Sequence, residues 1–317
     1  EAPVPVVKIF NEEKRLGGAA NVALNFASIG CHVSLMGFIG NDDGKIFIEN
    51  QLIRNKIDNQ LLSFSEISTT TKLRIISRNF QLIRLDFENE KENYKNINYE
   101  EILKKFNLIV NEFDLIVFSD YDKGALKNVD ELIKISNNLN IPSIVDPKQK
   151  NEFIYKYASV LKPNLNEFEM MVGICKSEDE LDQKAFELIE RLHLEALVLT
   201  KGSDGISLYR KDKKSFKQKS SSKEVYDVTG AGDTVLSIFG AFLSRGIDLN
   251  KAVHFANEAA GIVISKIGTS FITENDLIRI NNKSDIFLNK LKSYKDLIEI
   301  IENHRLNNQK IVMTNGC

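Results

Sequence analysis

The sequence predicts an α/β fold in which a mostly parallel central sheet is accompanied by a small antiparallel β lid. Each of four apolar runs is followed by polar residues and then by a helical pattern, and these runs lie at 115–118, 142–145, 159–162 and 196–199. Strands that alternate with helices in this way are typical of parallel βαβ units. Two further runs with alternating apolar and polar residues, at 72–78 and 81–86, predict a β-hairpin with one polar face, which forms the lid.

Length, composition and charge indicate a soluble globular protein. The 317 residues are 43% hydrophobic and 27% charged, which suits one large domain or two smaller ones. The net charge of -2 supplies no basic field for nucleic acid, and no apolar run is long enough to span a bilayer. No secretory segment opens the chain, and Cys31, Cys175 and Cys317 have neither metal-ligand nor disulfide spacing. We therefore expect a cytoplasmic protein that binds neither nucleic acid nor a membrane.

The stretch at 227–233, Asp-Val-Thr-Gly-Ala-Gly-Asp, precedes an apolar run that predicts a buried helix. Gly230, Ala231 and Gly232 then lie at the helix N-terminus, where unpaired amides and the helix dipole favour a bound phosphate. Asp233, beside this anion site, is suited to act as a general base that takes the proton of a hydroxyl group. The same residues are also compatible with a plain glycine turn and a helix-capping aspartate.

Further polar residues follow the predicted strands, at the edge where ligands bind in sheets of this kind. Lys148, Asn164, Glu167 and the turn at 200–205 each come directly after one of these strands. Several such strand ends in a row favour a binding site over unrelated turns. Taken singly, Lys148 is also compatible with a solvated strand end, and Glu167 with a helix-capping acid.

A second helix start with small residues lies at 17–21, Gly-Gly-Ala-Ala-Asn. Small residues permit a ligand to approach closely, and the Asn21 amide can bond sugar hydroxyls. An ordinary helix packed through small residues explains this segment equally well. On the polar face of the predicted hairpin, Arg74 and Arg84 present cations either to an anionic substrate or only to solvent.

The two ends of the sequence predict a division into domains. We expect residues 1–286 to form one domain, with lid strands at about 1–16 and 68–88 and with one strand missing upstream. The segment at 289–308 has the pattern of a charged amphipathic helix, and 310–316 that of an apolar strand. We therefore expect 287–317 to be a connecting helix and the first strand of a second, truncated domain.

Two of these motifs together resemble the signatures of the ribokinase-type carbohydrate kinases. The run at 17–21, with Gly30 and Gly40 at the following spacings, is similar to the first signature, and 227–233 is similar to the second. The resemblance covers nearly the whole chain in the correct order. It implies a ribokinase-like three-layer sandwich with kinase activity.

The resemblance also implies roles for individual residues. Asp233 would be the catalytic base, and Gly230, Ala231 and Gly232 would hold the transferring phosphoryl group. Asn164-x-x-Glu167 is similar to the magnesium and phosphate element of the family, in which Glu167 orders Mg²⁺ through water. The implied ATP contacts are Asn164, Thr200, Gly202, Gly205 and Asn257, and the implied sugar-phosphate contacts are Gly18, Asn21, Lys148, Arg74 and Arg84. A monovalent cation is a further cofactor that the resemblance allows.

Other runs look like one branch of that family, the heptose 7-phosphate kinases of the bifunctional lipopolysaccharide-heptose enzymes. These runs lie at 71–74, 81–86, 119–121, 224–227 and 312–317. The branch implies ATP-dependent phosphorylation of D-glycero-D-manno-heptose 7-phosphate at O1, in ADP-heptose synthesis for lipopolysaccharide core. It also implies a homodimer formed through the lid. In the full-length protein it implies a second domain with heptose 1-phosphate adenylyltransferase activity, a nucleotidyltransferase whose first strand resembles 310–316.

Three other functions are compatible with parts of the pattern. A kinase of another phosphosugar would differ mainly around Gly18, Asn21 and Lys148. A non-catalytic sugar- or nucleotide-binding regulator could use the same fold, although an intact Asp233 argues against it. A dinucleotide oxidoreductase is disfavoured because no Gly-x-Gly-x-x-Gly follows an early strand.

Overall fold

The computed structural model describes residues 7–77, 80–94, 97–221, 230–265 and 271–281, together with residue 298. The chain divides into two compact units, Glu1–Thr273 and Glu274–Cys317. In the second unit, residues 274–281 are helical. The segment expected to form a connecting helix and a strand, 287–317, lies outside the described residues except for residue 298.

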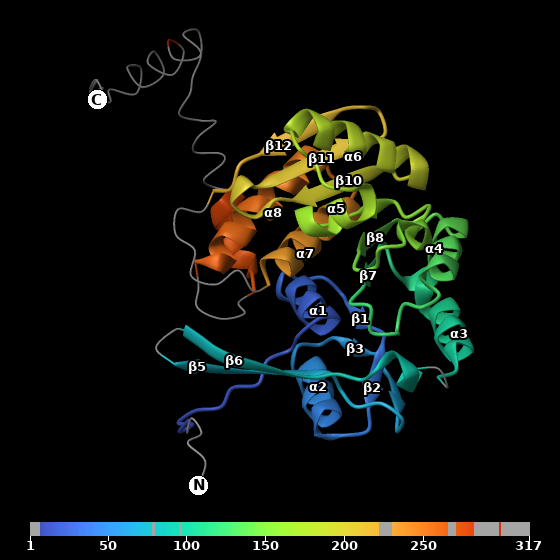
Figure 1. The fold of residues 1–317 in the computed structure, drawn as a ribbon, viewed down its shortest axis with the longest axis vertical. Helices are drawn as coiled ribbons and strands as arrows, with labels where there is room; N and C mark the ends of the chain where they lie inside the picture. Colours follow the sequence, from blue (N-terminus) through green and yellow to red (C-terminus); the bar gives the residue numbers. More distant parts are fainter. Residues whose placement is uncertain are drawn as a thin grey trace. The chain divides into compact units, whose positions relative to one another are not determined.

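The first unit is built on a six-stranded sheet with the order β12-β11-β10-β9-β8-β7 (Figure 1). Its strands are β7 (Ile116–Ser119), β8 (Ser143–Asp146), β9 (Val160–Leu161), β10 (Ala196–Thr200), β11 (Ile206–Arg210) and β12 (Ser215–Gln218). The strands β7 to β10 are parallel, whereas β11 and β12 are antiparallel to their neighbours. This confirms the predicted mostly parallel sheet and each of its four predicted parallel strands.

Helices cover both faces of this sheet, as the alternation of its side chains requires. Leu197 and Leu199 of β10 pack into a core shared with α3 (Tyr99–Ile109), α4 (Val129–Asn138), α5 (Leu165–Val172) and α6 (Glu178–Leu192). On the other side, α8 (Leu249–Ile264) contacts β11 and β12, α7 (Ala231–Ser244) packs on α8, and α1 (Ala19–Ser28) packs on α7. The result is the expected three-layer α/β/α arrangement.

The sequence of α6 shows why these helices form where they do. Ser177 caps its N-terminus by accepting a hydrogen bond from the Glu180 amide, and three acidic residues in the first turn complement the helix dipole. Its buried residues are Leu181, Ala185, Leu188, Ile189 and Leu192, which share one face at helical spacing. Burying each of the larger side chains contributes about 1.5–3 kcal/mol, so this face fastens the helix to the sheet.

The N-terminal part of the unit forms smaller parallel pairs. The strand β1 (Ser34–Leu35) pairs with β3 (Asp58–Asn59), and β2 (Phe38–Gly40) pairs with β4 (Leu62–Phe64). The helix α2 (Asp43–Arg54) connects them and is capped by Asp42, whose side chain accepts from the Lys45 amide. Met36 and Gly37, between β1 and β2, belong to neither strand.

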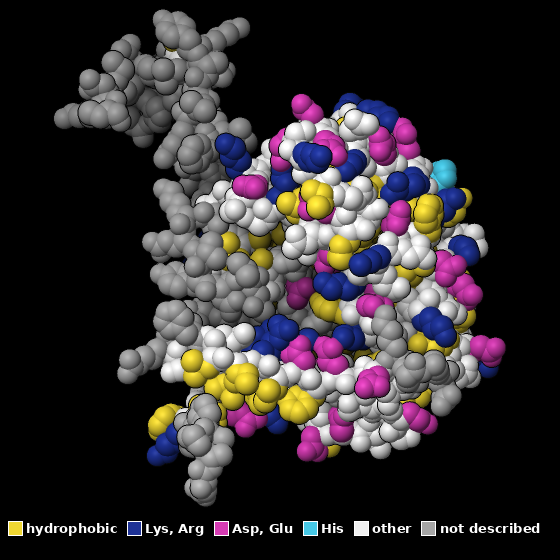
Figure 2. All heavy atoms as spheres, viewed as in Figure 1, with side chains coloured by type: hydrophobic (Ala, Val, Ile, Leu, Met, Phe, Trp, Pro, Cys, Tyr) yellow, Lys and Arg dark blue, Asp and Glu magenta, His cyan; other side chains and the backbone are white. Residues whose placement is uncertain are grey.

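The predicted lid is a two-stranded antiparallel hairpin, β5 (Thr71–Ser77) and β6 (Phe80–Phe87), which Figure 1 shows as a long ribbon beside α2. Its register shifts between Ile75 and Ile76. Figure 2 shows apolar side chains gathered over this hairpin, and Leu73, Ile83 and Phe87 are 43%, 46% and 55% exposed. The expectation of a further lid strand at about 1–16 was wrong for its described part, because residues 7–16 form no regular element.

Short 3₁₀ turns complete the described elements of the first unit, at Lys91–Tyr94, Val110–Glu112, Glu152–Tyr155 and Gly202–Asp204. None of the helices in the described part of the chain has the length and apolar character needed to cross a lipid bilayer.

Candidate active site

The centre of the candidate site is the first turn of α7, where Asp233 meets residues from two distant elements. The Asn21 side-chain amide on α1 donates to Asp233 Oδ2 over 2.6 Å. The Tyr121 hydroxyl, which follows β7, lies 3.5 Å from Asp233 Oδ1. Packing of α1 against α7 brings Asn21 and Asp233 together, so the two glycine-rich motifs of the sequence form one site.

The environment of Asp233 opposes and supports its ionisation at the same time. Burial raises the pKa of the Asp233 carboxyl, while the hydrogen bond from Asn21, the charge of Lys162 and the Tyr121 hydroxyl act to lower it. A general base must be ionised at working pH and must have a pKa high enough to take a proton. These opposing influences suit Asp233 to that role.

The start of α7 has the geometry expected of an anion site. Gly230 occupies the N-cap position with φ of +85°, a left-handed conformation that favours glycine, and no side chain caps the turn. Its carbonyl accepts from the Thr234 amide over 2.9 Å, which starts the helix. Ala231 and Gly232 follow in the first turn, where helix amides lack intrahelical partners. The preceding residues of this motif, 227–229, lie outside the described part.

A buried ion pair that the sequence analysis did not single out lies beside this turn. Lys162, which follows β9, is 4% exposed, and its Nζ lies 2.9 Å from Asp146 Oδ1 at the end of β8. Burial raises the pKa of Asp146 to about 6, although Lys162 acts in the opposite direction. A Cβ atom added to Gly232 would lie 3.8 Å from Lys162 Nζ, so the ammonium group faces the first turn of α7.

Asn164 and Glu167 form a capping box at the start of α5. The Asn164 side chain accepts from the Glu167 amide over 2.9 Å, and Glu167 Oε2 accepts from the Asn164 amide over 3.0 Å. Glu167 Oε1 lies 3.2 Å from Lys148 Nζ. Both carboxylate oxygens therefore have protein partners, and Lys148 contacts the candidate metal residue. Among the described residues, no cluster of three His, Cys, Asp or Glu is suited to hold a metal directly.

The expected nucleotide loop is a tight turn between β10 and β11. Thr200 bridges to Asn164 and thus joins this loop to the capping box. The Lys201 amide donates to the Gly205 carbonyl over 2.8 Å, and Gly205 has φ of +88°. A Cβ on Gly205 would lie 2.0 Å from the Gln218 carbonyl oxygen, whereas one on Gly202 would meet nothing within 4 Å. Gly205 is thus required by packing, and Gly202 leaves open space beside the loop.

Asn257 lies on α8 and is 5% exposed. Its side-chain amide donates to the Lys219 carbonyl over 2.9 Å, beyond the end of β12. This contact joins α8 to the segment that follows β12. A buried amide with a purely structural role would make the same contact.

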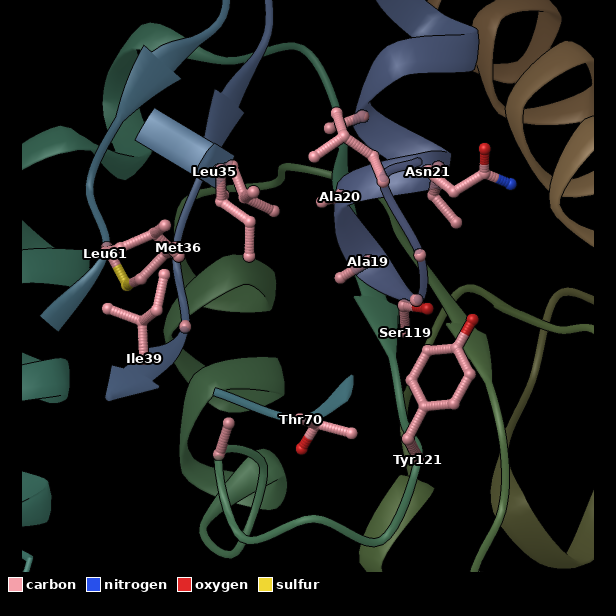
Figure 3. Close-up of a pocket in the computed structure, with 18 of the residues that line it drawn as sticks. Ala19, Ala20, Asn21, Leu35, Met36, Ile39, Leu61, Thr70, Ser119 and Tyr121 are labelled. Carbon is pink, nitrogen blue, oxygen red and sulfur yellow. The ribbon is translucent and has the colours of Figure 1, made fainter. Parts of the chain in front are cut away.

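The residues expected to contact the sugar phosphate line one large cavity, together with the base. This cavity has a volume of about 2150 Å³, and its lining includes Gly18, Asn21, Arg74, Arg84, Lys148 and Asp233. Figure 3 shows Asn21 and Tyr121 on one side of it, across from the apolar side chains of Leu35, Met36 and Leu61. The Tyr121 ring packs against Gly18, where an added Cβ would lie 3.5 Å from it.

A network of polar residues that the sequence analysis did not single out links the loops around this cavity. Buried Asp120 accepts from the Tyr155 hydroxyl over 2.6 Å and from the Gln149 side-chain amide over 2.9 Å. The Tyr155 oxygen in turn accepts from the backbone amides of Lys148 and Gln149, over 3.3 and 3.2 Å. This network therefore joins the loop that carries Tyr121 to the loop that carries Lys148.

This fold and site define an α/β enzyme with a buried carboxylate beside an anion-binding helix start. The model of the pfkB family carbohydrate kinases matches residues 2–276 of the chain. The chain therefore belongs to the pfkB family and is a carbohydrate kinase, as the sequence signatures indicated.

Relatives that match the whole chain include bifunctional HldE proteins of two species. The Bifunctional protein HldE of Pasteurella multocida (strain Pm70) is 40% identical over 318 residues, and that of Vibrio cholerae serotype O1 (strain M66-2) is 41% identical over 317 residues. Each alignment covers 100% of this chain and 66% of the relative. The chain thus spans about two thirds of the length of these relatives.

Solved structures of sugar kinases share the fold at low sequence identity. Ribokinase from Giardia lamblia superimposes with a TM-score of 0.71 at 18% identity, covering 89% of this chain and 93% of that one. Phosphofructokinase-2 from Escherichia coli has a TM-score of 0.68 at 18% identity, covering 86% of this chain and 92% of that one. These likenesses support the ribokinase-like fold.

Proposed function

We propose that this carbohydrate kinase transfers the γ-phosphoryl group of ATP to O1 of D-glycero-D-manno-heptose 7-phosphate. The observation that carries the proposal is the placement of Asp233, bonded to Asn21 at 2.6 Å and set in the uncapped first turn of α7. Similarity to the HldE proteins over the whole chain supports the heptose branch.

The chain's own residues supply positioning, a base and an anion site. Asp233 accepts the proton of the sugar 1-hydroxyl group while the oxygen of that hydroxyl attacks the γ-phosphorus of ATP. The bond between this phosphorus and the ADP oxygen breaks. The amides of Gly230, Ala231 and Gly232 hold the oxygens of the transferring group, whose charge spreads in the transition state. Asn21 holds Asp233 in one orientation, which keeps the attacking hydroxyl in line.

ATP would lie along the loop after β10, with Thr200, Gly202 and Gly205 near its phosphates and Asn164 and Asn257 as further contacts. The open space beside Gly202 is compatible with a phosphate group that approaches the backbone. The side-chain nitrogen of Asn257 donates to the Lys219 carbonyl, so its oxygen is the atom that would contact the adenosine side.

Glu167 is our candidate for ordering Mg²⁺, and its bonding pattern fits a contact through water. Its two oxygens already accept from Lys148 Nζ and the Asn164 amide, so a bound metal would be reached through the water shell that magnesium retains. Mg²⁺ supplies neutralisation of the phosphate charge when it is bound. The Lys148 ammonium group adds a positive charge beside Glu167. We also propose a monovalent cation as a further cofactor.

The phosphate already on the substrate would be held by the lid. Arg74 and Arg84 lie directly opposite each other in the hairpin register, and both line the cavity. Like charges directly opposite destabilise a β pair, so an anion between them would relieve a cost that the hairpin otherwise carries. Gly18 and Asn21 would contact the sugar itself.

The exposed apolar face of the hairpin supports a homodimer formed through the lid. Leu73 pairs with Leu85 and Ile75 with Ile83, which places these side chains on one face of an isolated two-stranded sheet. Such a ribbon is marginal alone and gains stability when that face is covered. We further propose that the full-length protein is cytoplasmic, carries a heptose 1-phosphate adenylyltransferase domain, and serves ADP-heptose synthesis for lipopolysaccharide.

A coupled ADP-release assay across a panel of phosphosugars tests the proposal. We expect turnover with heptose 7-phosphate and a new anomeric phosphate in the ³¹P spectrum of the product. Higher kcat/KM for another phosphosugar would support the alternative of a kinase with a different acceptor. Absence of turnover with every acceptor, despite ATP binding, would favour a non-catalytic regulator.

A further inference from the structure

A buried lysine stands between a carboxylate and the anion site without a role in the reaction described above. Lys162 Nζ pairs with Asp146 Oδ1 at 2.9 Å, and the two residues lie at the carboxyl ends of the adjacent parallel strands β9 and β8. Their side chains are 5% and 18% exposed. The same ammonium group faces Gly232 and acts electrostatically on Asp233.

Stability alone is a weak reason for this arrangement. Taking two charges out of water costs several kcal/mol per ion, and well-packed apolar residues often serve a fold equally well. The pair also does not connect remote elements, because β8 and β9 already pair and the Lys162 amide already donates to the Val145 carbonyl over 2.8 Å. A fixed cation at the ligand-binding edge of a parallel sheet is better explained by a bound anion.

The N–H donors that Lys162 does not use for Asp146 are consistent with a bound anion. An ammonium group has three N–H donors, and among the described residues Asp146 is the carboxylate that Lys162 pairs with. Gly232 presents no side chain toward it, so the space between Nζ and the first turn of α7 stays open to a ligand oxygen. The cation and the helix amides therefore converge on one position.

We propose that Lys162 is a catalytic residue that binds an oxygen of the transferring phosphoryl group, and that Asp146 is a positioning residue that aims it. This inference rests on the proposed kinase reaction and adds a cation to its anion site. Charge grows on the phosphoryl oxygens in the transition state, so Lys162 should act on kcat more than on ATP binding.

Three variants separate catalysis from packing. Lys162→Met removes the charge but leaves Asp146 buried without its partner, which can itself unfold the protein. The double variant Lys162→Met with Asp146→Asn removes both charges at similar volume. Asp146→Asn alone keeps the Lys162 ammonium and an oxygen that accepts from it. Each variant is assayed for kcat, for its melting temperature and for affinity for ADP.

We expect the double variant to melt near the wild type while its kcat falls roughly 10²–10³-fold, the usual effect of losing one transition-state donor. Asp146→Asn should keep kcat within roughly tenfold of wild type, because the catalytic cation remains. Affinity for ADP alone should change less than about threefold, whereas affinity for ADP with tetrafluoroaluminate, which imitates the transferring group, should fall at least about 30-fold.

A folded double variant that keeps more than about a third of wild-type kcat would make the pair structural and overturn the proposal. Equal losses in Asp146→Asn and in the double variant would do the same. The two binding measurements need no acceptor sugar, so they decide the role of Lys162 even if no phosphosugar in the panel is turned over. Failure of the wild type with every acceptor would count against the proposed function instead.

Discussion

Asn21 donates from its side chain to Asp233 over 2.6 Å, although 212 positions separate the two residues in the chain. The bond joins the start of α1 to the start of α7, which pack against each other. An added Cβ on Gly230 would lie 3.5 Å from the same Asn21 nitrogen, so the glycine of one motif makes room for the amide of the other. Asn21, the proposed sugar contact, and Asp233, the proposed base, are therefore coupled directly by one hydrogen bond.

The first prediction concerns the pH dependence of Asn21→Ala. The hydrogen bond from Asn21 favours the ionised form and lowers the pKa of Asp233, against the raising effect of burial. Below that pKa the base is protonated, so kcat/KM falls as pH falls. Removing Asn21 should move this acidic limb to higher pH and lower kcat/KM about tenfold, which matches the loss of one charge-assisted hydrogen bond.

Asn25→Ala is the matched control for this experiment. Asn25 lies one turn further along α1 and is buried, but its amide donates to the Asn21 carbonyl rather than to Asp233. The acidic limb of the kcat/KM pH profile of Asn25→Ala should stay at the wild-type position. If both variants shifted the limb equally, the effect would come from the helix as a whole and the Asn21 bond would lose its assigned role.

The second prediction concerns the base itself. Asp233→Asn should lower kcat by roughly 10²–10⁴-fold, the usual contribution of general-base catalysis. Removing a carboxylate whose burial disfavours its charge should leave folding intact. Kinetics at saturating substrate and a melting curve check both statements. Retention of more than about a third of wild-type kcat would exclude Asp233 as the base.

The sequence was most informative where local chemistry determines local structure. A glycine-rich turn before an apolar run predicted the start of α7, and apolar runs that end in polar residues predicted β7 to β10. Asp233 and Asn21 could be singled out because each stands at a predicted helix start rich in small residues, which leaves room for a ligand beside the polar side chain.

Lys162, Asp120 and Tyr155 were missed in the sequence analysis. A lysine at a strand end is usually solvated, and only the fold shows that Lys162 is buried beside Asp146. Tyr155 lies in a short 3₁₀ turn and looks like an ordinary core residue until Asp120, 35 positions earlier, is placed against its hydroxyl. Long-range polar pairs of this kind leave no periodic pattern in a sequence.

The third prediction concerns the lid. Arg84 Nε already lies 2.9 Å from Asp86 Oδ1, which orients its guanidinium group over the polar face of the hairpin. Arg84→Ala should raise KM for the phosphosugar by roughly tenfold or more at nearly unchanged kcat, because one charge-assisted contact contributes about 1.5–3 kcal/mol. The unphosphorylated sugar is the control acceptor, and its KM should not respond. Unchanged KM for the phosphosugar would leave Arg84 as a surface or interface charge.

The fourth prediction compares two glycines of the same loop. Gly205→Ala would place a Cβ 2.0 Å from the Gln218 carbonyl oxygen at a positive φ, so it should lower the melting temperature by several degrees. Gly202→Ala meets nothing within 4 Å, so only its positive φ should cost stability, about 1 kcal/mol. If the loop holds ATP, Gly202→Ala should raise KM for ATP. A folded Gly202→Ala enzyme with normal KM for ATP would show that ATP does not bind against this loop.

The last prediction concerns the buried network behind the cavity. The Tyr155 hydroxyl donates to Asp120 and accepts from the amides of Lys148 and Gln149, so it links the loops that carry Tyr121 and Lys148. Tyr155→Phe keeps the ring and removes only that link. It leaves the Asp120 carboxylate with its bonds from Gln149 and the Asp122 amide, so the fold should survive with a loss of about 1–3 kcal/mol.

The kinetic consequence distinguishes positioning from general stability. Tyr121 reaches toward Asp233 and Lys148 reaches Glu167, so loosening both loops should raise KM for the phosphosugar and lower kcat together, each by roughly threefold to tenfold. Tyr209→Phe is the matched control. The Tyr209 hydroxyl on β11 donates to Asp182 on α6 over 2.7 Å, and neither residue lines the cavity. The control should lose similar stability with unchanged kinetics. Equal kinetic losses in both variants would show that general stability, and not the placement of Tyr121 and Lys148, is what Tyr155 provides.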